Sequence, residues 1–134
     1  MAGTFTFELV SPEKLLFSKA VTMVTVPGSL GEYGVLVGHA PMITDLVPGV
    51  IRIYEEEGKV ASRLFVKGGF AEVNQTRFTV LATEATPVTE QSREELKAKA
   101  KELSDRISAA TTDEERDALW AQKDILMDML RGAA

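Results

Sequence analysis

The spacing of apolar residues changes once along this 134-residue chain, at about Pro87. Before Pro87, apolar and polar residues alternate over short runs, as in residues 4–10 (TFTFELV), and Gly- or Pro-containing turns separate the runs. A period of two is typical of strands with one buried face. After Pro87 the apolar residues recur every three or four positions, the spacing of amphipathic helices. The pattern predicts an α+β protein with an N-terminal antiparallel β-sandwich over residues 1–87 and a C-terminal antiparallel two-helix hairpin over residues 88–134.

The first segment contains several short β-rich runs. We expect strands over residues 4–10, 21–26, 35–37, 50–54, 60–66, 70–73 and 77–82. The charged residues 55–59 and the Asn-Gln-Thr sequence at 74–76 are expected to close two hairpins. Residues 28–34 (GSLGEYG) read as a loop in which glycines supply positive φ angles.

Two capping boxes mark the starts of the expected helices, at residues 92–95 (SREE) and 112–115 (TDEE). A break of about two residues between the helices makes them antiparallel, and Gly132 is expected to end the second one. The predicted stripes are Leu96, Ala100, Leu103, Ile107 and Ala110 in the first helix, and Leu119, Ile125, Leu126, Met129 and Leu130 in the second. Trp120 and Met127 fall outside the stripe, either as scattered surface residues or as a partner-binding face.

The composition excludes several classes of function. The chain has no Cys and a single His, whereas zinc sites, thiol nucleophiles and most catalytic triads need these residues. A net charge of -5 has the wrong sign for a nucleic-acid binder. Apolar runs of a few residues fall far short of the roughly 20 needed for a membrane span, so we expect no direct membrane insertion. Residues 1–20 show no targeting signal.

The remaining polar motifs give weak support for catalysis. The glycine-rich residues 28–34 lack the Gly-Lys-Ser/Thr of a phosphate-binding loop. His39 is the only imidazole, and no Gly-x-Ser-x-Gly accompanies it. We therefore predict no catalytic or metal-binding residues. A small cofactor-free enzyme that uses His39 with Glu32 or Asp45 stays an alternative of another class.

The order of motifs in residues 31–53 (GEYGVLVGHAPMITDLVPGVIRI) closely resembles the epsilon subunit of bacterial F-type ATP synthases. A Gly-x-x-Gly loop, the Gly-His-Ala-Pro motif, a Thr and a Pro-Gly pair follow one another as in that family. The resemblance extends to the Phe-x-Leu-Val-Ser-Pro-Glu motif at residues 7–13, to Gly68-Gly69 and to the terminal helix pair. It implies a non-catalytic central-stalk (rotor) subunit that couples proton-driven c-ring rotation through gamma to ATP synthesis, with regulation of ATP hydrolysis as a further role.

The resemblance also implies partners, positions and a location. Glu32 and Tyr33 correspond to the loop that meets the c-subunit ring, and Ser11, His39 and Thr44 to the surface that faces the gamma subunit. An extended hairpin would also reach the alpha and beta subunits. The family places the chain at the cytoplasmic face of the bacterial inner membrane, as a peripheral part of the ATP synthase complex.

The first helix departs from the family's ATP-binding motif, an aliphatic residue, Asp, two variable residues and Arg-Ala. The matching positions here include Arg93, Glu94, Lys97 and Ala98, and a lysine cannot make the bidentate contact of an arginine. This degenerate motif argues against ATP binding, and no cofactor is expected. A nucleotide-sensing regulatory module that acts through the hairpin stays the alternative within the same family.

Overall fold

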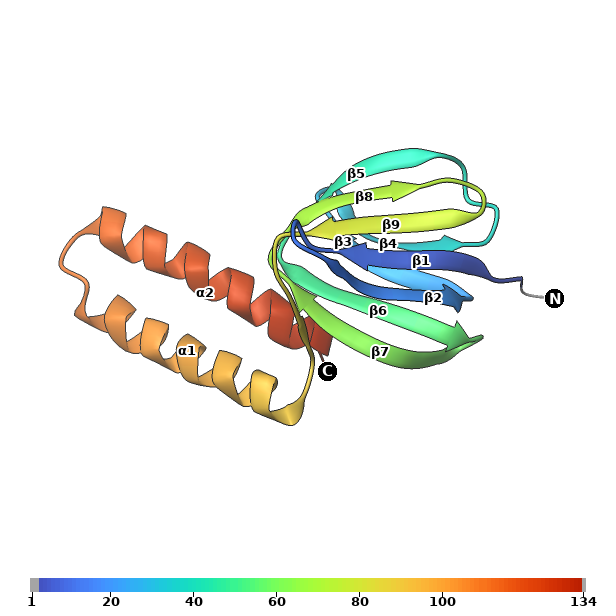
Figure 1. Ribbon diagram of the computed structural model, residues 1–134. Helices are drawn as coiled ribbons and strands as arrows, with labels where there is room; N and C mark the ends of the chain where they lie inside the picture. Colours follow the sequence, from blue (N-terminus) through green and yellow to red (C-terminus); the bar gives the residue numbers. More distant parts are fainter. Residues whose placement is uncertain (1–2, 134) are drawn as a thin grey trace. The chain divides into compact units, whose positions relative to one another are not determined.

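The computed structural model describes residues 3–133 (Figure 1). The chain divides into two compact units, the first ending at Pro87 and the second beginning at Val88. The first unit is made of strands and the second of two helices. The predicted fold class, a β-sandwich followed by a helical hairpin, is therefore confirmed.

The described part of the first unit, residues 3–87, contains ten strands in two layers. Their bounds are β1 (Phe5–Val10), β2 (Leu15–Val21), β3 (Met23–Gly28), β4 (Gly31–Leu36), β5 (Met42–Leu46), β6 (Gly49–Glu56), β7 (Lys59–Val66), β8 (Gly69–Val73), β9 (Arg77–Ala82) and β10 (Ala85–Pro87). Strands β10, β7, β6, β3 and β4 make one layer, and β5, β8, β9, β1 and β2 make the other (Figure 1). The pair of Gly28 with Leu46 joins the layers.

The core lies between the layers because the strands alternate as predicted. Phe5, Phe7 and Leu9 of β1 are buried, and the residues between them are half-buried. The ring of Phe7 lies 5.6 Å from that of Phe78 and 5.8 Å from that of Phe17, measured between centroids. Packing phenylalanine rings from three strands against one another stabilises this layer.

The prediction of a wholly antiparallel sandwich is wrong at one pair of strands. Strand β1 pairs with β9 in parallel, with Phe7 opposite Phe78. The hairpin of β8 and β9 leaves one edge of β9 open, and β1 fills it running in the same direction. This arrangement keeps the apolar faces of both strands on the core side.

Three strands were absent from the sequence prediction, namely β2, β5 and β10. Most of β2 is exposed on both faces, so it lacks the alternation that reveals a strand. The predicted loop at residues 28–34 is also too long, because β4 begins at Gly31 and pairs with β3 throughout. In that stretch, only Gly31 has a positive φ, of 128°.

The second unit consists of α1 (Glu90–Ala109) and α2 (Asp113–Ala133), which contact each other along their lengths. The first predicted cap is misplaced by three residues. Thr89 caps α1, since its hydroxyl accepts from the Ser92 N–H at 3.0 Å and the Ser92 hydroxyl accepts from the Thr89 N–H at 2.7 Å. Ser92 thus takes the position that a Glu usually fills in this motif. The second cap is as predicted, with the Glu115 N–H donating to the Thr112 hydroxyl at 3.1 Å.

Two details of α2 differ from the prediction. The helix continues through Gly132, since glycine is tolerated in a last turn that has ordinary helical geometry. Ile125 is 43% exposed, so it lies at the margin of the stripe, whereas Leu119 and Met129 are buried. Trp120 and Met127 lie outside the stripe, as predicted, and are 45% and 43% exposed.

Candidate functional site

A cleft lies at the open edge of the sandwich, where β4 of one layer faces β5 of the other. Its lining comes from the β3–β4 hairpin, the connection to β5 and β5 itself, and includes Glu32, Tyr33, His39 and Thr44. The structure therefore brings together four of the five residues that the resemblance assigned to partner contacts. The Tyr33 hydroxyl and the Thr44 hydroxyl are hydrogen-bonded across the cleft.

Alternation along β4 sends neighbouring side chains to opposite faces. Tyr33 points to the core side, opposite the fully buried Val26 of β3, and its ring packs on the core. Glu32 points outward and pairs with Arg52 of β6, with 3.2 Å between Oε1 and the guanidinium Nη1. The Glu32 side chain is 53% exposed, so the pair holds the carboxylate in place while leaving it open to a partner.

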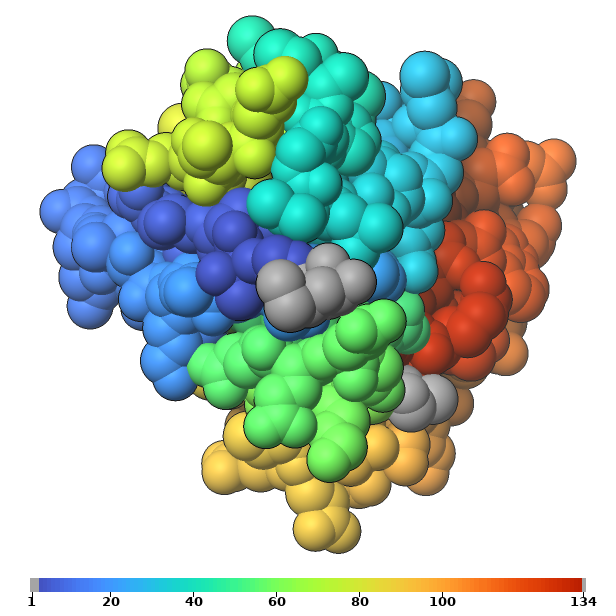
Figure 2. Space-filling view, turned by 90° about the vertical axis from the view of Figure 1, so that its right-hand side faces the viewer, coloured from blue at the N-terminus to red at the C-terminus, as the bar shows by residue number. Residues whose placement is uncertain are grey.

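His39 is held by the backbone around it. Its Nδ1 donates to the Ala40 carbonyl at 2.7 Å, and the Gly38 N–H donates to the Gln75 carbonyl at 3.1 Å. Figure 2 shows the β4–β5 connection (teal) beside the β8–β9 turn (yellow-green), in agreement with the second bond. The imidazole thus secures a turn through one of its nitrogens.

Ser11 lies apart from the cleft, in the turn between β1 and β2. Its N–H donates to the Lys14 carbonyl at 2.8 Å, and its hydroxyl accepts from the Lys14 N–H at 3.2 Å. It follows Val10, which pairs with Leu81 at the far end of β9 from the Gln75 turn. Ser11 and His39 therefore mark opposite ends of the same layer.

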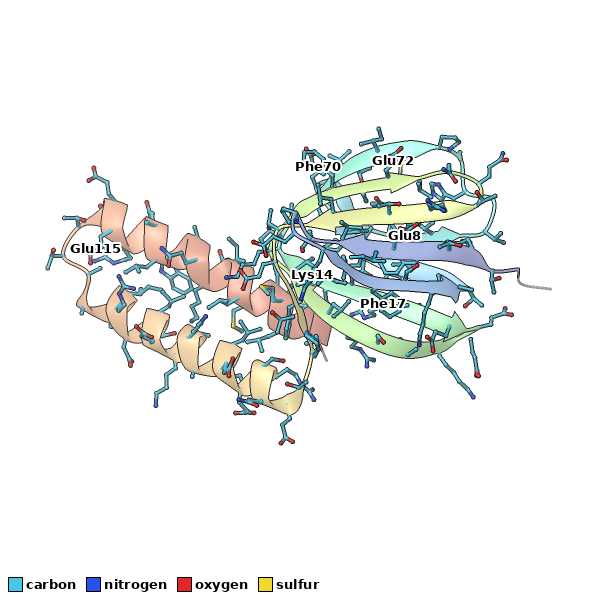
Figure 3. All side chains as sticks on the ribbon, in the orientation of Figure 1. Glu8, Lys14, Phe17, Phe70, Glu72 and Glu115 are labelled. Carbon is cyan, nitrogen blue, oxygen red and sulfur yellow. The ribbon has the colours of Figure 1, made fainter. Side chains whose placement is uncertain are left out.

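The outer face of that layer carries an apolar row that the sequence analysis missed. Neighbouring strands place Phe70 beside Leu81, Leu81 beside Val10, and Val10 beside Leu15. Phe70, Leu81 and Leu15 are 56%, 42% and 55% exposed. Figure 3 shows Phe70 and Glu72 on β8, with Glu8 on β1 of the same layer. In the sequence, this row corresponds to apolar residues at positions of β8 and β9 where the alternation predicts outward-facing side chains.

Ile43 of β5 extends this outer face. It is 72% exposed and pairs with Glu72. An exposed cluster of large apolar side chains flanked by carboxylates is typical of a protein-binding surface. We call the residues Ile43, Phe70, Leu81, Val10 and Leu15 the apolar face.

The candidate ATP motif lies on an exposed side of α1. Lys97 Nζ is 3.3 Å from Glu94 Oε1, and both side chains are more than 60% exposed. Ala98 is exposed as well. The cation that would have to meet a phosphate therefore has a carboxylate beside it.

The described residues offer little for metal chemistry. Within residues 3–133, no group of three or more His, Asp or Glu side chains is placed to hold a metal ion.

In the same part of the chain, neither helix is apolar enough over a sufficient length to cross a membrane.

Comparison with known proteins identifies the family. Residues 4–88 match the family model described as the ATP synthase delta/epsilon chain, beta-sandwich domain. The ATP synthase epsilon chain of Paramagnetospirillum magneticum is 52% identical over 116 residues, which cover 87% of this chain and 86% of that relative. The epsilon chain of Rhodospirillum centenum is 51% identical over 123 residues, covering 89% and 84%.

Solved structures give the same result. A chain in the cryo-EM structure of the Euglena gracilis mitochondrial ATP synthase, described as OSCP/F1/c-ring, matches with a TM-score of 0.77 and 25% identity, covering 98% of this chain and 80% of that one. A chain in the Tetrahymena thermophila central stalk/c-ring structure shares the fold, with a TM-score of 0.65 and 14% identity over 97% and 96% of the two chains. The family model covers the β-sandwich, and the curated relatives are about 50% identical over most of the chain. The chain therefore belongs to the ATP synthase epsilon-chain family.

Proposed function

We propose that this chain works as a rotor subunit in the central stalk of an F-type ATP synthase, where it couples c-ring rotation through the gamma subunit to ATP synthesis. The family supports a subunit of the complex that is not itself catalytic. The observation that carries the mechanical role is the presence, on one small sandwich, of two separate surfaces suited to partners. One is the apolar face, and the other is the exposed β3–β4 hairpin beside the cleft.

The gamma subunit is assigned to the apolar face. This surface offers large side chains from five strands, with Leu81 on the middle strand and Ile43 at one margin. Ser11, a predicted gamma contact, borders the face at the turn after β1. Interfaces that hold permanently are more apolar than the rest of a protein surface, and a rotor subunit must not slip on its partner.

The c ring is assigned to the β3–β4 hairpin. Leu30 at its tip is fully exposed, and Glu32 follows two residues later with its carboxylate held by Arg52. An exposed apolar tip next to a positioned charge suits the edge of a partner's polar loop, because the charge fixes orientation and the apolar group adds contact area. A chain with these proposed contacts would be a peripheral part of the membrane-bound complex, on the cytoplasmic side in a bacterium.

The experiment is a direct binding measurement. The purified chain is mixed with the gamma subunit of the same ATP synthase, and association is followed by analytical ultracentrifugation. We expect a complex at micromolar concentration. Failure of the folded chain to associate with gamma, alone or within the F1 sector, would contradict the proposal.

A further inference from the structure

Strand β4 is the least supported strand of the hairpin that we assign to the c ring. In the described part of the sandwich it pairs with β3 only, so its outer edge has no neighbouring strand. It also contains Gly34 at mid-strand, and glycine weakens a strand because it loses more conformational freedom on ordering. A strand bound on one side can hinge about that side unless another contact holds it.

The turn end of the hairpin is tied to β5 by the backbone. The Ser29 N–H donates to the Asp45 carbonyl at 3.0 Å, and the Val47 N–H donates to the Pro27 carbonyl at 2.9 Å. These bonds fix the end of β3 and the turn. Neither bond is made by a residue of β4, in which Glu32 is the second residue.

Tyr33 supplies the missing support. Its ring lies against the core, and its hydroxyl reaches across to the inward-facing hydroxyl of Thr44 on β5, in the opposite layer. Both residues are half-buried, and each satisfies the other's hydroxyl. Side chains engaged in this way present little to an outside partner.

Strand β5 also reaches the apolar face, since the residue before Thr44 is the exposed Ile43. One short strand therefore receives the tie from the hairpin on its inner side and offers a contact to the gamma-facing surface on its outer side. Glu32 is bonded through the backbone to Tyr33, and Ile43 is bonded through the backbone to Thr44. The hydrogen bond between the Tyr33 and Thr44 hydroxyls therefore connects Glu32 with Ile43.

We propose that Tyr33 and Thr44 are positioning residues, a strut that locks β4 to β5 and so holds Glu32 rigidly relative to the apolar face. This inference rests on the proposed function for its two ends. It assigns to Tyr33 and Thr44 a role inside the subunit in place of direct contact with the c ring and gamma. Its consequence is that the hairpin transmits force without bending away from the sandwich.

The first test measures the local rigidity of the purified chain. Tyr33→Phe and Thr44→Val each remove one hydroxyl and keep the shape of the side chain. We expect the β4 amides to exchange with solvent about fivefold faster in either variant, the effect of losing one neutral hydrogen bond. The double variant should show no further increase, and Thr44→Ser should restore slow exchange. Tyr54→Phe on β6 is the matched control and should leave β4 unchanged.

The second test uses the assembled enzyme in membrane vesicles. With Tyr33→Phe or Thr44→Val, we expect this subunit to remain bound and ATP synthesis per unit of proton-motive force to fall below the wild-type level, while Thr44→Ser stays at that level. If both variants exchange and synthesise ATP like the wild type while the subunit stays bound, the strut is wrong and the proposed function stands. If the wild-type chain itself does not join the enzyme, the proposed function fails.

Discussion

Replacing Phe70 with alanine is expected to weaken binding to gamma. Phe70 is 56% exposed, and a phenylalanine side chain offers roughly 200 Å² for burial, so roughly 110 Å² is open to a partner. At about 25 cal/mol per Å², covering that area contributes up to roughly 3 kcal/mol. Alanine keeps part of the contact, which leaves an expected loss of about 2 kcal/mol, or about 30-fold in Kd.

The assay is a titration of gamma with the wild-type chain and with two variants. Leu36→Ala is the matched control, because Leu36 of β4 is also 56% exposed but lies outside the apolar face. It should change Kd by less than about twofold. Both variants should unfold within about 0.5 kcal/mol of the wild type, because both side chains are exposed. Equal binding of Phe70→Ala and the wild type would refute the assignment of gamma to this face.

Three further predictions concern the fold and the hairpin. Gly69→Ala should lower the free energy of unfolding by roughly 3 kcal/mol or more in urea titrations, because φ is 147° and a Cβ would overlap the Leu81 carbonyl oxygen. The control variant Gly34→Ala should lower the free energy of unfolding by less than about 1 kcal/mol. Thr89→Ala should destabilise α1 by about 1 kcal/mol in the same assay followed by circular dichroism, and an unchanged midpoint would show that the cap is dispensable. Millimolar ATP should leave the thermal midpoint unchanged in calorimetry, since Lys97 already has a carboxylate beside it; a midpoint that rises with ATP concentration would show nucleotide binding.

The fold was predictable where apolar residues follow a strict period. Phe5, Phe7 and Leu9 alternate and are buried, and the change of period at Pro87 separates strands from helices. Strand β2 was not predictable because it is exposed on both faces and its adjacent residues Leu15 and Leu16 break the alternation. The cap at Thr89 was missed because a serine fills the position where glutamate is the usual signal.

The candidate site was predictable in composition but not in arrangement. The motif identified Glu32, Tyr33, His39 and Thr44, and all four line one cleft. That Tyr33 bonds to Thr44 depends on how two layers face each other, and no local pattern contains that information. The apolar face depends in the same way on strand order, since Phe70 and Leu81 become neighbours only through pairing.

The subunit is expected to contact gamma through the apolar face and the c ring through the β3–β4 hairpin. Because the chain contains no cysteine, single-cysteine variants can be cross-linked without removing native thiols. In the assembled enzyme, Glu32→Cys should cross-link to a c subunit and Phe70→Cys to gamma. Cross-links from both positions to non-rotating subunits, with none to gamma or the c ring, would show that both interface assignments are wrong.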